Sequence, residues 1–458
     1  MLADRFVHLA EEGWSGVFAQ RRTLDRAIDL ALGGLVALGR RTVSRAICAA
    51  GRSQQDWSAD YRLFSRSPWS QDRLFDPAMC DWLGRYGHGP IPVALDDTGL
   101  PRSGRKIATA FWQRDPLSPP FHVNLRYGQR FMQASVIYPH DDEVSCGPRG
   151  VPIRFVECPV VKKPGKRATD AEWAAWRQAR REQNLSTQGA QVMAGVRTRF
   201  DALGASERPL WAMVDGSLCN RYILRALPDR VELIGRCRKD ARLCWPAPAG
   251  SRRWYDPNPF TPESIRADET IPWQEASVYY GGGRRTVRYK QLAGVLWQRG
   301  AGRRPLRLIV IAPQPYKPSP GAKTLYRQPA YLLTTDLTSP PEALIQCYLD
   351  RWQIEVNHRD EKDLLGVGQA QVWSTHSLAR QPALLVAAYS LLLVAAVQCF
   401  GPQRSPDYLP LPTWRKTPRR ASTLDMLTRL RHDLLTAAPS DGTGLNALAR
   451  NLIAHAYT

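Results

Sequence analysis

The hydrophobic positions of the chain change their spacing several times, and each change marks a predicted element. Apolar residues recur three or four positions apart over 1–85 and 169–203, which is typical of amphipathic helices. Short apolar runs, typical of strands, lie at 91–95, 121–127, 131–138, 151–156, 210–214 and 231–237. Because helical and strand patterns alternate over this half of the chain, the sequence predicts an α/β fold with a mixed sheet.

The region from 238 to 338 has another pattern, richer in Pro, Gly and Trp. We interpret it as a β-rich insertion, with short strands at 276–280, 286–289, 295–298, 306–312 and 331–335. Residues 339–342 form a pattern that is typical of the start of a helix. They precede a predicted helix without Gly or Pro over 348–362. The sequence therefore predicts that a β-rich segment separates the first strands from this helix.

The stretch Ala383–Phe400 is almost uncharged and has the minimum length of a membrane-spanning helix. It contains polar residues, is rich in Ala and has no second span to accompany it, so we expect a helix buried in the core and no membrane. A Pro- and Arg-rich linker over 401–420 precedes a last helical segment, which is expected to reach the end of the chain.

The predicted helix over 348–362 has one unusual face. At about 100° per residue, four of its side chains lie within roughly 60° of one another, namely Tyr348, Arg351, Glu355 and Lys362. Trp352 and Arg359 flank this face, and Asp350 and Glu361 lie on the opposite side, so Glu355 is its only carboxylate. Such a face is a salt-bridged surface in many helices, and it forms a chemical site only if other residues complete it.

The composition indicates a polyanionic partner. Lys and Arg number 63 against 42 Asp and Glu, which gives a formal charge of +21. An anionic membrane surface and a nucleic acid are both compatible with this excess, and we favour nucleic acid because the arginine fork fits phosphate oxygens. The nine cysteines form no CxxC pair and no zinc-finger spacing. Their pattern predicts reduced thiols in a cytosolic protein rather than a disulfide framework or a zinc module.

Two of the predicted strands end in acids. One apolar run is followed by Asp96 and Asp97, and a later one is followed by Asp215. Carboxylates at strand ends suit a hard cation, although an Asp pair also caps turns frequently. A basic loop with Arg105 and Lys106 comes soon after the first pair and would suit a phosphate backbone.

The spacing Tyr-x2-Arg-x3-Glu-x6-Lys, with two strand-end acids upstream, resembles the DDE-class insertion-sequence transposases of the IS4/IS701-like group, relatives of the Tn5 transposase. The resemblance covers about residues 90–400. Three strands, a helix, a strand ending in Asp, an insertion and a helix with Glu are the plan of an RNase H-like core. The implied segments are a helical DNA-binding domain at 1–88, the core at 89–237 and 339–400, the β-rich insertion at 238–338, and a C-terminal linker and helical segment at 401–458.

The resemblance implies the roles of the acids. Asp97, Asp215 and Glu355 would be the catalytic residues and would bind two Mg²⁺ ions, for which Mn²⁺ is a substitute. The Asp-Thr context of the family favours Asp97 as the first ligand, and Asp96 is the alternative.

The resemblance also implies DNA contacts for several cations and aromatics. Tyr348, Arg351 and Lys362 match positions that hold phosphates in the family, so we expect them to bind DNA rather than to neutralise Glu355. The basic residues Arg359, Arg105 and Lys106 are further predicted contacts. Tyr331 lies where related enzymes stack a flipped base, and a core aromatic is the alternative interpretation of this residue.

The implied function is metal-dependent cleavage of DNA at transposon ends, followed by strand transfer into target DNA. The expected partners are double-stranded DNA, both terminal inverted repeats and target, and a second copy of the chain as a homodimer in the DNA complex. The expected location is the bacterial cytoplasm, in association with the nucleoid. Two alternatives are a domesticated DNA-binding protein without cleavage activity and a stand-alone RNase H-like nuclease. The complete set of acids argues against the first, and the basic flanking segments argue against the second.

Overall fold

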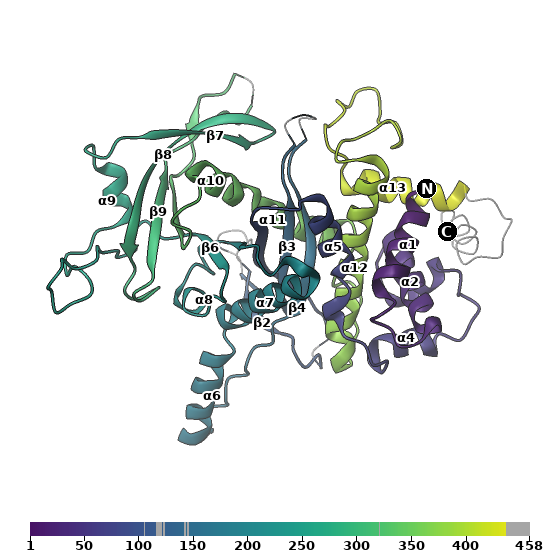
Figure 1. Ribbon diagram of the computed structural model, residues 1–458. Helices are drawn as coiled ribbons and strands as arrows, with labels where there is room; N and C mark the ends of the chain where they lie inside the picture. Colours follow the sequence, from purple (N-terminus) through teal and green to yellow (C-terminus); the bar gives the residue numbers. More distant parts are fainter. Residues whose placement is uncertain are drawn as a thin grey trace.

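The computed structural model describes residues 1–436 except 105, 116–120, 122, 123, 142, 144, 145 and 320. Arg105 therefore lies outside the described residues, as do parts of the predicted segments 121–127 and 401–458. A ten-stranded mixed sheet forms the centre of the molecule, and hydrophobic cores lie on both of its faces (Figure 1). The predicted α/β fold with a mixed sheet is confirmed.

Five strands form the central part of the sheet: β1 (Ile91–Pro101), β3 (Leu125–Tyr138), β4 (Arg149–Glu157), β5 (Leu210–Val214) and β6 (Val231–Arg236). Their spatial order is β4-β3-β1-β5-β6. The pairs β4–β3 and β3–β1 are antiparallel, whereas β1–β5 and β5–β6 are parallel. The sheet thus changes from antiparallel to parallel at β1, the strand that carries the first predicted acids.

β1 and β3 are longer than the apolar pattern predicts. We expected β1 to end before Asp96, but it continues to Pro101 because its backbone pairs with β3 along this length. The separation of the predicted runs 121–127 and 131–138 is also wrong, since β3 runs from Leu125 through Gly128 to Tyr138. The backbone of Leu100 lies so close to Gly128 that a side chain would have no room. Asp96 and Asp97 therefore lie inside a strand, where successive side chains point to opposite faces.

The predicted β-rich region contains four long strands and a short helix: β7 (Gln274–Tyr280), β8 (Gly283–Leu296), β9 (Pro305–Ile311), β12 (Ala330–Thr334) and α9 (Pro262–Ala267). The runs predicted at 286–289 and 295–298 are parts of one strand, β8. β12 pairs with β6 on one side and with β9 on the other, so the region continues the central sheet. Smaller strands are β2 (Phe111–Arg114), β10 (Pro315–Tyr316) and β11 (Leu325–Tyr326).

The helices next to the sheet are α6 (Asp170–Glu182), α7 (Leu185–Phe200), α8 (Arg221–Leu224), α10 (Pro341–Asp350) and α11 (Trp352–Asp363). The single helix predicted over 169–203 is two helices, because Asn184 caps the start of α7 through the backbone N–H of Thr187. α6 buries none of its residues and projects from the body of the protein (Figure 1). The predicted helix over 348–362 is also divided, and Arg351 lies at the junction of α10 and α11.

α12 (Thr375–Phe400) is the central helix of the largest hydrophobic core. Within the described residues it alone is long and apolar enough to span a membrane, but 83% of its most apolar window is buried inside the protein. This burial confirms the predicted core helix. Around it lie α1 (Leu2–Trp14), α2 (Arg21–Val36), α3 (Val43–Ala49), α4 (Ser58–Ser65), α5 (Asp76–Arg85) and α13 (Thr423–Thr436), on the side of the molecule away from β7–β9 (Figure 1).

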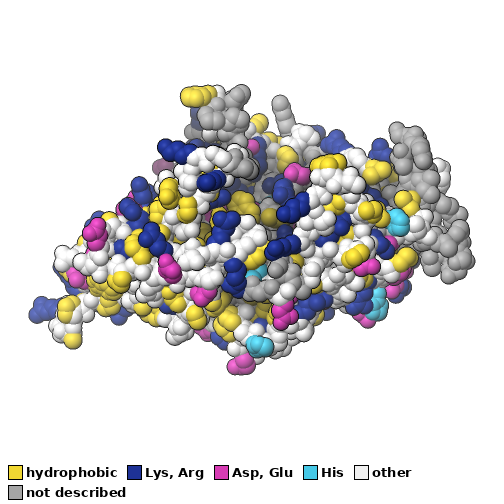
Figure 2. Space-filling view, turned by 90° about the horizontal axis from the view of Figure 1, so that it is seen from above, with side chains coloured by type: hydrophobic (Ala, Val, Ile, Leu, Met, Phe, Trp, Pro, Cys, Tyr) yellow, Lys and Arg dark blue, Asp and Glu magenta, His cyan; other side chains and the backbone are white. Residues whose placement is uncertain are grey.

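Basic side chains are spread over the surface, as the composition predicts. Figure 2 shows Lys and Arg across the centre and left of one face, the part of the molecule that contains β7–β9 and α10 in Figure 1. Asp and Glu are fewer and more scattered on this face. A polyanion that approached this side would meet mainly positive charge.

The close packing of α2 against α3 leads to a testable prediction for the stability of the protein. A methyl group on Gly33 of α2 would collide with the backbone carbonyl of Ala46 in α3. We expect Gly33→Ala to lower the free energy of unfolding by about 1–3 kcal/mol, measured as a shift of the urea midpoint. Gly84→Ala in α5 is the matched control, because no atom lies within 4 Å of its added methyl group. This control should gain stability by up to about 1 kcal/mol, and equal effects of the two substitutions would contradict the described contact.

Candidate active site

The parallel pairing of β1 with β5 places two predicted acids side by side. Leu95 is paired with Val214, the last residue of β5. The residues that follow, Asp96 and Asp215, therefore lie next to each other just beyond the paired part of the two strands. Burial and the negative charge of Asp215 raise the pKa of Asp96 to about 7, while the charge of Arg351 acts in the opposite direction. The two carboxylates are therefore close enough to repel each other.

Asp215 uses one of its oxygens to form a turn. Its Oδ1 accepts hydrogen bonds from the backbone N–H of Ser217 at 2.9 Å, the hydroxyl of Ser217 at 2.7 Å and the backbone N–H of Leu218 at 3.1 Å. Its Oδ2 makes no hydrogen bond with the described residues. The turn therefore fixes the direction of the side chain and leaves one oxygen for a ligand.

Asp96 and Asp97 face different neighbours. The Asp97 carboxylate forms an ion pair with Arg130 of β3, with 3.2 Å between Oδ2 and Nε. Burial and Asp215 raise the pKa of Asp97, and Arg130 opposes this rise. The Asp96 carboxylate instead faces the helices, with 3.6 Å between its Oδ2 and Nη1 of Arg351. The geometry therefore favours the alternative, Asp96, over Asp97 as the acid that is grouped with Glu355.

Arg351 lies between Asp96 and Glu355, the carboxylate of α11. Its Nη2 lies 2.8 Å from Oε1 of Glu355, four residues further along the chain. Its guanidinium also lies 5.8 Å from the centre of the Tyr348 ring. The expectation that Arg351 does not neutralise Glu355 is therefore wrong for this structure. The reason is that Arg351, at the junction of α10 and α11, lies between two carboxylates and compensates both.

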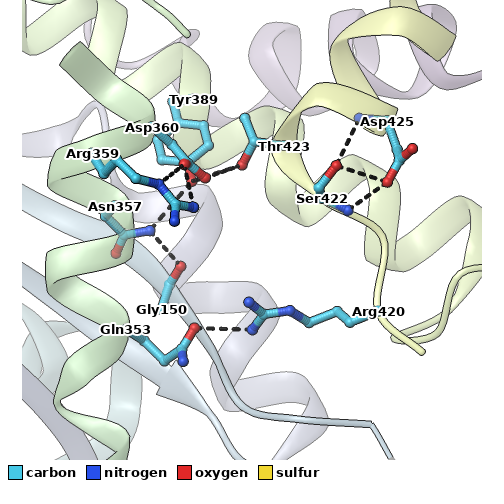
Figure 3. A network of polar contacts seen from close by, with 10 residues as sticks. All are labelled: Gly150, Gln353, Asn357, Arg359, Asp360, Tyr389, Arg420, Ser422, Thr423 and Asp425. Atoms are coloured by element: carbon cyan, nitrogen blue, oxygen red, sulfur yellow. Dashed lines mark hydrogen bonds and ion pairs between the residues drawn. The ribbon is translucent and has the colours of Figure 1, made fainter. Parts of the chain in front are cut away.

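The other cations predicted to bind DNA, Lys362, Lys106 and Arg359, differ in their position relative to the acids. Lys362 is partly buried near Arg126, and burial and the charge of Arg126 lower the pKa of its amine. Lys106 is exposed in a turn. Arg359 is exposed but bound to Asp360 at 2.8 Å, and Figure 3 shows both residues on the side of α11 that faces α12 and α13. Of these three cations, only Lys362 lies near the acids, as the effect of the Asp97 charge on its pKa indicates.

Tyr331 is a core residue rather than an accessible aromatic. Only 4% of its surface is exposed, and its hydroxyl donates a hydrogen bond to Glu263. A base cannot stack on a ring buried in this way, so the predicted DNA contact is corrected to the alternative, a core aromatic. Its place in the middle strand of three, between β6 and β9, explains the burial. Trp352, at the start of α11, is an aromatic side chain that is exposed beside the candidate site.

Two arginines of β3 belong to the site and were not predicted from the sequence. Arg130 pairs with Asp97, and the charge of Arg126 acts on both Asp97 and Lys362. The only sequence signal that could have identified them is the register of β3 against β1. This register could not be derived from the sequence, because β3 was predicted as two separate runs, 121–127 and 131–138.

The carboxylates have the chemistry that a hard divalent ion requires. Asp96, Asp215 and Glu355 offer oxygen donors, and the partly buried, mutually repelling pair of Asp96 and Asp215 would be stabilised by added positive charge. In the described residues no three Asp, Glu, His or Cys side chains are close enough to hold an ion. Arg351 lies between Asp96 and Glu355. The donor set therefore fits Mg²⁺ by type, but an ion site would require Arg351 to move and the acids to come closer together.

No known protein family matches the chain, and no curated protein matches it either. The functional conclusion therefore depends on the residues of the site and their geometry. This geometry combines adjacent carboxylates at a strand end with a neighbouring helix that carries a third carboxylate and several cations. Such an arrangement is suited to chemistry on a phosphate ester.

The orientation of the two neighbouring Asp residues leads to a testable difference. We expect Asp96→Asn to weaken Mn²⁺ binding by about tenfold or more, because its carboxylate lies beside Asp215 and shares Arg351 with Glu355. Asp97→Asn should change the affinity by only about threefold or less, because its carboxylate is paired with Arg130. Electron paramagnetic resonance of free Mn²⁺ measures both affinities. A larger loss in Asp97→Asn would return Asp97 to the site in place of Asp96.

Proposed function

We propose that the protein is a DDE-class DNA transposase, which cleaves DNA at transposon ends and joins the ends to target DNA. The observation that carries this proposal is the grouping of Asp96, Asp215 and Glu355 through Arg351. Its sequence counterpart is the Tyr-x2-Arg-x3-Glu-x6-Lys spacing, which is distributed over α10, the junction at Arg351 and α11. The contact of Arg351 with Glu355 follows from this spacing. The position of Asp96 and Asp215 beside Arg351 is an independent observation, because the spacing contains no information about which strand lies beside which.

The order of the elements supports an RNase H-like core for this chain. Apart from the short β2, three strands come first, β1, β3 and β4, and the helices α6 and α7 follow. Then come β5, which is followed by Asp215, and after the β-rich region the helix α11, which carries Glu355. This is the expected order of strands, helix, second acid, insertion and third acid. The parallel neighbours β1 and β5 are the reason that the first two acids meet.

In the proposed reaction, Asp96, Asp215 and Glu355 would hold Mg²⁺. Bound ions of this kind would supply activation of the attacking oxygen and stabilisation of the leaving oxygen in a phosphoryl transfer. In the first step, a water oxygen forms a bond to phosphorus, the bond from phosphorus to the 3′ oxygen breaks, and that oxygen leaves as a 3′-hydroxyl. In the second step, this hydroxyl attacks a phosphate of the target DNA and displaces another 3′ oxygen.

Arg351 has a definite place in this proposal. In the described state its guanidinium supplies the positive charge between Asp96 and Glu355. When a metal ion takes over this charge, Arg351 is free to bind a DNA phosphate, for which its planar fork is well suited. Tyr348 lies under the same guanidinium, and Lys362 lies further along α11. These three residues would then line the path of the bound strand.

We propose double-stranded DNA as the partner, both as transposon ends and as target, with the protein acting as a homodimer in the DNA complex. The formal charge of +21 supports a polyanionic partner. The spread of Lys and Arg over the face in Figure 2 supports contact with a long phosphate backbone rather than with one small anion.

Removal of the third acid should separate chemistry from binding. We expect Glu355→Gln to lower the rate of metal-dependent cleavage and joining on the order of 10⁴-fold, while affinity for duplex DNA stays within about threefold. The assay uses the terminal DNA of the element, a target plasmid and Mg²⁺. Glu342→Gln, an exposed acid at the start of α10, is the matched control and should keep full activity. Cleavage retained in Glu355→Gln would exclude this residue from the chemistry.

Removal of Lys362 should affect binding rather than the reaction itself. We expect Lys362→Ala to weaken DNA binding and to reduce the slope of log affinity against log salt concentration by about 1, because one phosphate contact is lost. Lys362→Arg keeps the charge and should keep the slope. Fluorescence anisotropy with labelled terminal DNA over a series of salt concentrations measures this slope. An unchanged slope in Lys362→Ala would remove this residue from the DNA interface.

A further inference from the structure

A polar cavity lies behind α11, on the side away from Glu355. Its volume is about 170 Å³, and it is enclosed by β4, α11, α12 and the segment that leads into α13. Its lining is rich in charged and hydroxyl groups and includes Arg149, Asn357, Asp360, Tyr389, Arg420 and Thr423. Figure 3 shows α11 on one side of this region and the 420–425 segment on the other. The cavity therefore lies between α11, the helix that carries Glu355, and the segment that leads into α13.

Two arginines of this cavity have no acidic partner. Arg149 is buried and donates to the backbone carbonyl of Ala421 at 2.7 Å. Arg420 donates to the carbonyl of Pro148 and, at 2.9 Å, to Oε1 of Gln353 across the gap (Figure 3). Within the described part of the chain, neither guanidinium has a carboxylate within 4.0 Å, and the partners of both are carbonyl and amide oxygens.

The one acid in the lining is already compensated. Asp360 accepts hydrogen bonds from Arg359 at 2.8 Å and from the hydroxyl of Thr423 at 2.6 Å. Figure 3 shows Arg359 and Asp360 directed toward each other. Asp425, at the start of α13, caps its own helix through Ser422. The charge of Asp360 acts on Arg149 and Arg420, but the lining holds three arginines, Arg149, Arg359 and Arg420, against this single acid. The cavity therefore carries an excess of positive charge.

Such an excess is costly inside a protein, since buried charges without a counter-charge lose much of their hydration. The pKa values reflect this cost, because burial lowers the pKa of Arg149, and burial together with the charge of Arg149 lowers the pKa of Arg420 to about 10. Polar partners in the lining, such as Asn357 and Tyr389, can also donate or accept hydrogen bonds. The chemistry complementary to this lining is a compact oxyanion.

We propose that this cavity binds a phosphate-type oxyanion, held between the guanidinium groups of Arg149 and Arg420. The cavity has sufficient room, because a water molecule needs only about 10–15 Å³ of such volume. Bidentate hydrogen bonds from arginine match the oxygens of a phosphate. The bound anion would link β4 to the segment before α13, directly behind α11. This site shares no residue with the acids, so phosphate binding can be measured separately from the proposed DNA cleavage.

The experiment titrates inorganic phosphate into the full-length protein by isothermal calorimetry, at constant ionic strength with chloride as the background anion. We expect one saturable site in the wild type. Arg420→Gln should weaken it by about tenfold or more, because one charged hydrogen-bond donor group is lost. Arg419→Gln is the matched control, since Arg419 is the exposed neighbour in the chain and should leave the site intact. Arg420→Lys keeps the charge without the fork and should give an intermediate affinity, and it serves as the test if Arg420→Gln does not fold.

A competition experiment with duplex DNA distinguishes free phosphate from a DNA backbone phosphate as the ligand of the cavity. If a backbone phosphate of bound DNA occupies the cavity, duplex DNA will displace inorganic phosphate, and if free phosphate is the ligand, both will bind together. Either result supports the site. The absence of saturable phosphate binding in the wild type, or equal affinities in the wild type and Arg420→Gln, would overturn the proposal. Neither of these two results would bear on cleavage, which is measured separately with Glu355→Gln.

Discussion

Two carboxylates held side by side in a poorly hydrated place are the constraint on which the candidate site depends. Backbone pairing of β1 with β5 ends at Leu95 and Val214, and it places the next residues, Asp96 and Asp215, side by side. The repulsion between Asp96 and Asp215 must therefore be balanced by a cation. In the described state the cation is Arg351, which also neutralises Glu355. The three acids and the arginine form one electrostatic unit, so a change in any one of them alters the others.

α11 lies between a group of acids and a group of arginines. On its front, burial and the charge of Asp215 raise the pKa of Asp96, and Arg351 lies between Asp96 and Glu355. On its back, Arg149 and Arg420 have no carboxylate within 4.0 Å in the described residues. A shift of the helix axis would change the geometry on both sides, because residues of α11 contact both groups. The proposed oxyanion site would thus act on the same helix that carries Glu355.

The continuous sheet explains how distant parts of the chain are held relative to the acids. β12 joins the β-rich region to β6, so β7, β8 and β9 are hydrogen-bonded extensions of the strands that carry Asp96 and Asp215. The basic side chains on that region are consequently fixed at a definite distance from the acids (Figure 2). On the other side, α12 packs against β4 and the N-terminal helices in one shared core. A long polyanion could therefore contact both regions without a rearrangement of separate bodies.

The sequence by itself determined the elements whose signal is local. Apolar runs identified β4, β5, β6 and β9, the uncharged stretch identified the buried helix α12, and helical spacing grouped Tyr348, Arg351, Glu355 and Lys362. Only the tertiary structure decided the properties that depend on pairing between distant segments. The register of β3 extended β1 through Asp96 and Asp97 and directed them to opposite faces, and it brought Arg130 to Asp97. Tyr331 became a core residue because strands from other parts of the chain flank it. Local patterns are set by the order of residues, whereas the partner of a charge or a ring is set by which backbones hydrogen-bond, and no single segment contains that information.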